Sequence, residues 1–477
     1  MVGLHLFIRK NVVLEHFFLT LLSFCTKIID MRRYILDSLK TWKKSHNRKP
    51  LMLFGARQVG KTWLTREFAS TEYNDLIELN FFTNGSLKEI FAQDITPEYI
   101  IRQLEIKFNK SIDAKRTLLF FDEVQESERA MDSLKAFNDL APEYHIVAAG
   151  SFLGVMMGRR PVGQTDQITL YPMSLCEFLE AAGNDMLADA INSLDFQLLS
   201  GLAAMAETLL KQYYYIGGMP AAVLEFVTSG DLDKVREVQN RLLLDYKGDF
   251  SKHIGVHDIP KVGMLWDSIP VHLMKEKKKF VYKEIKTGAR SAEFENAMQW
   301  LVDTGLVHKV NRVDNPKIPL SANQSFGIFK LYMIDIGLFG AKAEISPRDI
   351  MSPNANVSDN FYGSVAEQFV CQELKSARHV SWQTRALFYW GREKSQAELD
   401  FLMQYKGEII PIEVKSARHT KAKSLQVYMR EYKPAYTVHT SLKNYGAEGN
   451  LYSIPLYTIG KLFDFFDWTM TGKITVA

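Results

Sequence analysis

The sequence has few cysteines, and they lie far apart. Cys25, Cys176 and Cys371 are the only ones, and their spacing gives neither a zinc-binding pair nor a disulfide framework. We therefore expect reduced thiols and a cytoplasmic protein. The sequence also has almost no excess charge, since 58 basic and 55 acidic residues leave a net charge of +3. This balance excludes a protein that binds nucleic acid through its overall charge, so any basic surface must be local.

Long apolar runs are scarce as well. The most apolar stretch, residues 17–24, is too short to span a bilayer, follows Glu15 and His16, and is not followed by a small-residue cleavage site. We therefore predict no membrane segment and interpret residues 1–30 as an extension that precedes a fold beginning near Met31. The 477 residues, 47% of them hydrophobic, suffice for about three domains.

The most specific motif is a glycine-rich run between an expected strand, residues 51–54, and an expected helix that includes residues 63–68. Eight residues fit the pattern G-x-x-x-x-G-K-[ST]: Gly55, Ala56, Arg57, Gln58, Val59, Gly60, Lys61 and Thr62. Backbone N–H groups of such a loop surround phosphate oxygens, and the N-terminus of the helix adds positive potential. We expect Lys61 to reach the β- and γ-phosphates of ATP and Thr62 to bind Mg²⁺.

A second motif is an acidic pair at the end of an apolar run. Residues 118–121 are apolar, which is typical of a strand buried on both faces of a parallel sheet, and Asp122 and Glu123 follow. Ligands bind at this edge of such sheets. Asp122 is predicted to accept water bound to Mg²⁺, and Glu123 to act as general base toward the attacking water. The alternative is an ordinary solvated loop.

Two further residues are candidates for hydrolysis. Ser151 ends the run 145–151, where it could sit between the acidic pair and the γ-phosphate and sense the phosphate; a plain turn at the end of a strand is the alternative. Arg159 lies in a loop before the expected strand 167–170, where it could stabilise transition-state charge as an arginine finger. The alternative for Arg159 is a solvated surface side chain.

These motifs carry a family resemblance. Residues 55–62, 118–123, 150–151, 158–159 and 170–178 resemble the prokaryotic AAA-type ATPases that have a C-terminal DUF4143 domain. The resemblance extends over nearly the whole chain from Met31. It implies an AAA+-like core that uses ATP and Mg²⁺, and it suggests a homo-oligomer in which Arg159 acts in trans. The family usually has Phe where Leu175 stands, an apolar exchange that alters no chemistry.

The middle of the chain is expected to be helical. Residues 186–260 are interrupted by Gly217-Gly218-Met219-Pro220, which is similar to a Gly-Gly-x-Pro turn of the family, and we interpret them as a lid over the nucleotide. In residues 261–325, a short helix (282–286), a glycine turn, a longer helix and the strand 306–310 give the order of a winged helix. Glu293, Glu295 and Asp303 make the candidate recognition face acidic. Two interpretations of this module therefore remain. It packs against protein, or it contacts nucleic-acid phosphates through Lys277–Lys279, Lys283 and Lys286.

The last part of the chain carries a metal-binding pattern on two expected strands, 398–403 and 409–415. Asp400, Glu413 and Lys415 give the arrangement D…E-x-K, and Glu413 and Lys415 share one strand face. Two carboxylates can hold Mg²⁺, and Lys415 can position water or offset charge. The pattern is similar to the PD-(D/E)xK nuclease core. This resemblance implies that Glu367, on the expected helix from residue 363, adds a metal ligand and that Glu398 matches the acidic position of the family before the Asp.

The sequence therefore predicts an α/β protein with four parts after the extension: a P-loop AAA+-like ATPase core (31–185), a helical lid (186–260), a winged-helix-like module (261–325) and a C-terminal restriction-endonuclease-like α/β domain (326–477). The expected function is ATP binding and hydrolysis coupled to a nuclease-like domain that processes nucleic acid. DNA is expected as the nucleic acid in preference to RNA. The alternative is a nucleotide-dependent switch or interaction protein whose nuclease fold does not cleave.

Overall fold

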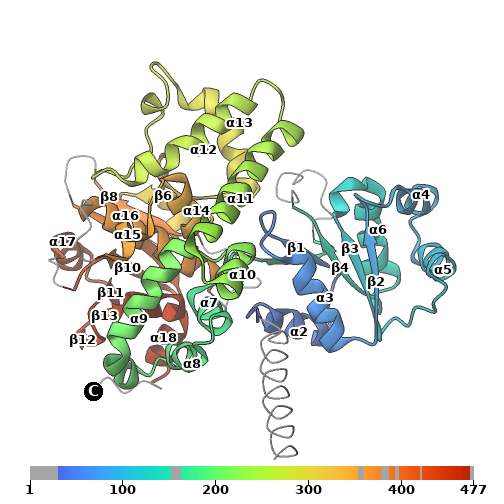
Figure 1. The fold of residues 1–477 in the computed structure, drawn as a ribbon, viewed down its shortest axis with the longest axis horizontal. Coiled ribbons are helices and arrows are strands. Elements are labelled where there is room, and N and C mark those ends of the chain that lie inside the picture. Colours follow the sequence, from blue (N-terminus) through green and yellow to red (C-terminus); the bar gives the residue numbers. More distant parts are fainter. Residues whose placement is uncertain are drawn as a thin grey trace, which may run out of the picture.

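The computed structural model describes residues 31–151, 163–352, 359–377, 386–392, 397–418 and 422–472. These residues form two sheets joined by a largely helical middle (Figure 1). Arg159 and the expected extension 1–30 lie outside the described residues. Among the helices that the structure describes, none combines the length and the apolar character needed to cross a membrane.

The first sheet is parallel, with the strand order β2-β3-β4-β1-β5. The elements of this part are α2 (Leu36–Lys44), β1 (Leu51–Phe54), α3 (Lys61–Glu72), β2 (Asp75–Asn80), α4 (Gly85–Gln93), α5 (Pro97–Phe108), β3 (Thr117–Asp122), α6 (Glu128–Leu140), β4 (His145–Ala149) and β5 (Asp166–Thr169). Leu118 and Phe120 of β3 face one hydrophobic core, and Leu119 and Phe121 face the other. Burial on both faces explains why this strand is continuously apolar.

The order of the strands determines which loops meet at the carboxyl edge. β4 lies between β1, which leads into the phosphate loop, and β3, which leads into the acidic pair. Since parallel strands end at the same edge, residues that follow β1, β3 and β4 gather there. The predicted P-loop-like parallel sheet is thereby confirmed.

The helical middle of the chain is also confirmed. It consists of α7 (Leu175–Ala181), α8 (Asp185–Asn192), α9 (Phe196–Ile216), α10 (Pro220–Ser229), α11 (Leu232–His253) and α12 (Ile259–Leu273). Gly217 ends α9 with φ 76°, a left-handed conformation that glycine adopts without strain. Pro220 then opens α10 at its first turn, where its missing N–H costs nothing.

The second sheet is mixed and has the order β12-β13-β11-β10-β9-β8-β6-β7. Its strands are β6 (Val307–Val313), β7 (Gln324–Met333), β8 (Phe388–Gly391), β9 (Glu398–Tyr405), β10 (Glu408–Val414), β11 (Thr437–Ser441), β12 (Gly446–Glu448) and β13 (Leu451–Pro455). The accompanying helices are α13 (Ser291–Asp303), α14 (Ile336–Lys342), α15 (Pro347–Met351), α16 (Asp359–Ser376), α17 (Lys423–Tyr432) and α18 (Leu462–Met470). The predicted C-terminal mixed α/β sheet is therefore present.

Three details differ from the winged-helix interpretation. The expected wing strand is β6, which pairs with β7 on one side and β8 on the other and so is an interior strand of the second sheet. The expected first helix, 282–286, is only a 3₁₀ turn at Tyr282–Glu284. The predicted boundary at residues 325/326 falls inside β7. Long-range strand pairing, which leaves no local sequence pattern, places β6 and β7 in the second sheet.

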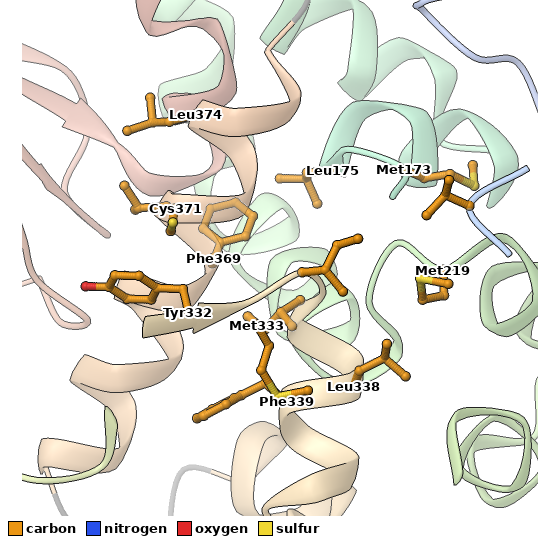
Figure 2. Close-up of a cluster of buried hydrophobic side chains, with 14 of the residues drawn as sticks. Met173, Leu175, Met219, Tyr332, Met333, Leu338, Phe339, Phe369, Cys371 and Leu374 are labelled. Atoms are coloured by element: carbon orange, nitrogen blue, oxygen red, sulfur yellow. The ribbon is translucent and has the colours of Figure 1, made fainter. Parts of the chain in front are cut away.

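Segments far apart in the sequence meet at Asp335, which is completely buried. Its carboxylate accepts hydrogen bonds from the Gly218 N–H at 2.6 Å and the Leu338 N–H at 3.0 Å. The Gly218 carbonyl in turn accepts the Met173 N–H at 2.7 Å. Apolar side chains of the same segments, including Met219, gather around this point (Figure 2). The junction thus connects the chain that leaves the first sheet to the start of α14.

Helix α16 extends the junction along the second sheet. The Gln368 amide accepts from the Met333 N–H at 2.9 Å and donates to the Met333 carbonyl at 2.7 Å. Gln372 accepts from the Ile336 N–H at 2.8 Å. The next residue, Glu373, accepts from the Leu175 N–H at 2.9 Å. One face of α16 therefore fixes both β7 and the first turn of α7.

Glu373 predicts a pH effect on stability. Burial, followed by the nearby charge of Glu177, raises the pKa of Glu373 to about 8. The folded chain then holds a proton that the unfolded chain releases near pH 4.5, so stability falls as pH rises from about 4.5 to about 8. Glu373→Gln keeps an acceptor for the Leu175 N–H and cannot ionise. We expect its melting temperature to match the parent near pH 5 and to exceed it by several degrees at pH 8–9.

Thermal unfolding across this pH range measures the difference. Glu237→Gln, at an exposed position on α11, is the matched control. A Glu373→Gln variant whose melting temperature stays parallel to that of the parent from pH 5 to pH 9 would contradict the assignment.

Candidate functional site

The glycine-rich loop has the backbone conformation that a phosphate site needs. Gly55 has φ 142° and Gly60 has φ 98°. A Cβ at Gly55 would lie 2.3 Å from the Leu170 carbonyl oxygen, so no larger residue fits without movement. Gly60 directly precedes α3 in the left-handed conformation. The N-terminus of α3, with its unpaired N–H groups, therefore opens into the loop.

Lys61 is buried and folds back over the loop. Its ammonium group donates to the carbonyl oxygens of Gly55 and Ala56, both at 2.9 Å. Burial lowers the pKa of Lys61 to about 8, although the carboxylates of Glu123 and Asp122 favour the charged form. A bound polyphosphate would offer this ammonium group stronger, charged acceptors at the same place.

The acidic pair lies across from the start of α3. Thr62 Oγ1 is 3.3 Å from Asp122 Oδ2, and Asn80 Nδ2 donates to the same oxygen at 3.1 Å. Burial, and then the charges of Glu123 and Glu78, raise the pKa of Asp122. A cation near Thr62 and Asp122 would offset that burial, so these residues fit Mg²⁺ as ligand and water acceptor.

Glu123 and Ser151 occupy the same edge. Glu123 adopts φ 51°, an unusual conformation for a non-glycine residue, and its Oε2 accepts from Gln125 Nε2 at 2.5 Å. Ser151 is buried directly after β4. Asn80 was not identified from the sequence, although it ends β2 in register with Asp122. Arg159 is the one predicted ATP-site residue outside the described part of the chain.

Helix α11 contacts the phosphate loop from the helical middle. Arg57 pairs with Asp249 at 2.5 Å, and Gln58 Nε2 donates to Asp245 at 2.8 Å. The Tyr246 hydroxyl donates to the Arg57 carbonyl oxygen at 2.9 Å. Every contact links residues about 190 positions apart, so no sequence pattern could have indicated them.

A second contact joins the loop to α7. Arg33 is buried and donates to the Val59 carbonyl oxygen at 2.9 Å and to the Tyr171 carbonyl oxygen at 2.6 Å. It also pairs with Glu177 at 3.3 Å. Glu177 belongs to the capping box of α7, together with Ser174. The phosphate loop is thereby held to the helix whose first turn Glu373 contacts.

The second candidate site is a cleft of about 830 Å³ in the C-terminal part. Asp400 on β9 and Glu413 on β10 line it, together with Lys415. The strands are antiparallel with Phe401 opposite Ile412, which brings Asp400 and Glu413 side by side. Asp400 Oδ2 accepts from the Val414 N–H at 2.8 Å, and Lys415 pairs with Glu413 at 2.5 Å. All three residues of the D…E-x-K pattern are therefore brought together.

Glu367 enters the same cleft from α16 but is engaged by other groups. Its carboxylate pairs with Lys278, lies 3.5 Å from the Lys330 ammonium group and accepts from the Tyr332 hydroxyl at 3.1 Å. Burial disfavours its charge, but Lys278 and Lys330 outweigh burial and lower the pKa of Glu367 to about 2. Lys330 and Tyr332 were not identified from the sequence, since both lie on β7 far from the motif.

Asp400 and Glu413 show the opposite electrostatics. Burial, and then the neighbouring carboxylates Glu367 and Glu413, raise the pKa of Asp400 well above its ordinary value. Burial also raises the pKa of Glu413, although Lys415 opposes it. Glu413 Oε2 is buried without a hydrogen-bond partner. These are the features of an acceptor pair that a cation would stabilise.

The described residues do not contain a group of three or more His, Cys, Asp or Glu side chains arranged to hold a metal ion. The three predicted ligands, Glu367, Asp400 and Glu413, line the same cleft without forming such a group. Asp400 and Glu413 still fit Mg²⁺, because this ion is often bound through one or two carboxylates, with water and substrate phosphate completing its shell.

Family models match three parts of the chain. An AAA domain matches residues 47–179, which include the phosphate loop and the acidic pair. Domains of unknown function match two further parts: DUF8612 at residues 207–349 and DUF4143 at residues 362–459. The chain joins an AAA domain to a DUF4143 domain. The resemblance noted in the sequence is thereby confirmed for both domains. The matched DUF4143 segment includes Glu367, Asp400, Glu413 and Lys415.

Remote similarity to solved structures also exists. The Walker-type ATPase PABY2304 of Pyrococcus abyssi is 14% identical and aligns over 66% of this chain and 96% of its own, with a TM-score of 0.42. The Orc1 protein of Aeropyrum pernix, solved in complex with DNA, is 10% identical over 65% of this chain and 90% of its own, with a TM-score of 0.29. Protein VC1899 from Vibrio cholerae is 11% identical over 88% and 98%, with a TM-score of 0.18.

These TM-scores are too low to assign a shared function. No curated protein matches the chain in sequence.

Proposed function

We propose that this AAA-type protein hydrolyses ATP at the edge of the first sheet and uses the nucleotide state to control the cleft of its DUF4143 domain. The observation that carries the proposal is the approach of Thr62 to Asp122, at 3.3 Å, beside the buried ammonium group of Lys61. Thr62 and Asp122 at this separation would hold Mg²⁺ beside the β- and γ-phosphates, and hydrolysis depends on that ion.

Each residue at this edge has its own role in the proposed hydrolysis. Lys61 would exchange the carbonyl oxygens of Gly55 and Ala56 for oxygens of the β- and γ-phosphates. Glu123 would take a proton from the attacking water, and Ser151 would contact the γ-phosphate. Thr62 and Asp122 would hold Mg²⁺, which neutralises charge on the phosphates. Arg159 remains the proposed arginine finger.

Two sets of contacts support coupling to the cleft. Residues 57 and 58 of the loop contact α11 through Asp249 and Asp245. The loop also contacts Arg33, which pairs with Glu177 on α7. The first turn of α7 is bound by Glu373 of α16, and the same helix carries Glu367 into the cleft. A shift of the loop therefore reaches the cleft through packed, hydrogen-bonded elements.

The cleft itself suits a phosphate backbone. Among the described residues that line it, seven are Lys or Arg and five are Asp or Glu. Lys277 and Lys279 are exposed at its rim, where ammonium groups would bind phosphates of nucleic acid without regard to sequence. Asp400 and Glu413 would hold Mg²⁺, which polarises a phosphodiester, and Lys415 would position water. Metal-dependent cleavage of DNA is the resulting activity.

A second function, binding without cleavage, is favoured by a specific observation. Lysines already pair with four of the five carboxylates that line the cleft: Glu367, Glu398, Asp400 and Glu413. A domain neutralised in this way could serve as a nucleotide-controlled binding surface. The restriction-endonuclease-like and winged-helix assignments, the domain boundaries, the homo-oligomer and the cytoplasmic location stay predictions.

A cleavage assay separates the two functions. The full chain is incubated with linear and single-stranded DNA and with Mg²⁺ or Mn²⁺, with and without ATP. We expect cleavage that Asp400→Asn reduces by about 100-fold or more, since it removes a metal ligand, and whose response to ATP is lost in Lys61→Ala. Asp233→Asn, an exposed carboxylate of α11, is the control. DNA binding without cleavage would favour the second function, and cleavage unaffected by Asp400→Asn would contradict the assigned site.

A further inference from the structure

Lys330 is a completely buried cation inside the acidic cleft. Its side chain has 1% exposure. The ammonium group lies 2.6 Å from Glu398 Oε1, 3.5 Å from Glu367 Oε2 and 3.9 Å from Asp400 Oδ1. One ammonium group therefore faces a carboxylate from α16 and two from β9. The sequence motif gives no reason for a lysine at this point.

Lys330 is held more firmly than the other cations of the cleft. Its backbone is paired with Val310 within the β6–β7 ladder. Its ammonium group also lies 4.9 Å from the centre of the Tyr389 ring, a cation–π contact. Lys278 and Lys415 have 11% and 28% side-chain exposure and come from segments at the edge of the cleft. Those two side chains keep contact with solvent, whereas the Lys330 side chain is enclosed.

The arrangement divides the carboxylates into two pairs. Glu367 and Glu398 lie beside Lys330, which supplies a fixed positive charge. Asp400 Oδ1 is the most distant of the three carboxylate oxygens around Lys330, at 3.9 Å, and Glu413 Oε2 beside it is buried without a hydrogen-bond partner. A metal ion near Glu367 and Glu398 would meet the Lys330 ammonium group at short range, and this repulsion is strong in a buried site. Among the described residues Lys330 forms no ion pair with Glu413, so a metal ion bound by Asp400 and Glu413 would be held farther from that charge than one between Glu367 and Glu398.

We infer that Lys330 acts as a permanent second cation, which restricts the cleft to a single divalent metal ion at Asp400 and Glu413. Lys330 is thus a positioning residue: it keeps Glu367 and Glu398 in place and excludes a second metal from them. This inference rests on the metal site proposed above. It assigns the cleft to one-metal chemistry, with the ammonium group in place of the second ion that two-metal phosphodiesterases use.

Manganese binding to the full chain tests the inference without any need for activity. Asp122→Asn serves as the background, because it removes the metal carboxylate of the ATP site. Stoichiometry is measured by titration calorimetry and by electron paramagnetic resonance of Mn²⁺. We expect one Mn²⁺ per chain in the background protein, two in Lys330→Met and one in Lys330→Arg, which restores the cation.

Each outcome is decisive. One Mn²⁺ per chain in Lys330→Met, or two in the background protein, overturns the inference and leaves the proposed metal site standing. No Mn²⁺ in the background protein overturns the metal site itself. If Lys330→Met unfolds without metal, Mn²⁺ should raise its melting temperature well above the rise seen in Lys330→Arg; an equal rise, or none, contradicts the inference.

Discussion

Lys61→Ala is expected to lower the rate of ATP hydrolysis by a factor of about 100 or more, with loss of nucleotide binding. The ammonium group is buried at the mouth of the phosphate loop and donates to the carbonyl oxygens of Gly55 and Ala56 at 2.9 Å. The other cation of residues 55–62, Arg57, pairs with Asp249. Removal of Lys61 therefore leaves the phosphates without the ammonium group that the loop provides. The measurement is steady-state phosphate release, together with binding of a fluorescent ATP analogue.

The matched control is Lys115→Ala, at an exposed position of the same domain. It should hydrolyse ATP at the rate of the unmodified chain. Unchanged nucleotide binding in Lys61→Ala would show that the phosphates bind elsewhere and would remove the site assignment.

Gly218→Ala is expected to destabilise the folded chain by about 1–3 kcal/mol. A Cβ at this position would lie 2.0 Å from the Met173 carbonyl oxygen and 2.8 Å from the Met173 nitrogen. Both are backbone atoms, so the hydrogen bond from the Met173 N–H to the Gly218 carbonyl must break or lengthen. The Gly218 N–H bond to the buried Asp335 would be strained at the same time. Urea unfolding followed by tryptophan fluorescence measures the loss.

Gly201→Ala provides the opposite expectation. Gly201 lies within α9, and a Cβ there meets no atom within 4 Å. Alanine should stabilise this helix by about 0.5–1 kcal/mol, because glycine loses more backbone entropy on folding. Equal unfolding midpoints for the two variants would show that the junction tolerates the added atom and does not join the domains rigidly.

Local patterns made the ATP site predictable. The loop at residues 55–62 is contiguous, and the apolar run of β3 points directly to Asp122 and Glu123. Asp400 and Glu413 could be predicted for a similar reason, because a hairpin sets their strands side by side. In each case the residues that carry the chemistry are placed by a single strand or turn, so spacing alone constrains their geometry.

The rest depends on contacts between distant segments. β6 and β7 join a sheet whose other strands begin at residue 388, and this pairing leaves no trace in the local pattern around the expected winged helix. Asp249 reaches Arg57 from the helical middle, and Lys330 reaches Asp400 across the second sheet. Glu367 was placed in the cleft by family resemblance, but its partners Lys278 and Lys330 could come only from the folded structure.

The central claim, that nucleotide at the phosphate loop controls the cleft, is tested most directly by hydrogen exchange of the α16 backbone amides. The full chain is compared with and without a saturating non-hydrolysable ATP analogue, in the parent and in Lys61→Ala. The contacts from Arg33 through Glu177 and Glu373 predict that the analogue changes exchange in α11 and α16 of the parent but not of the variant. A change confined to the phosphate loop and the end of β3 would contradict the claim.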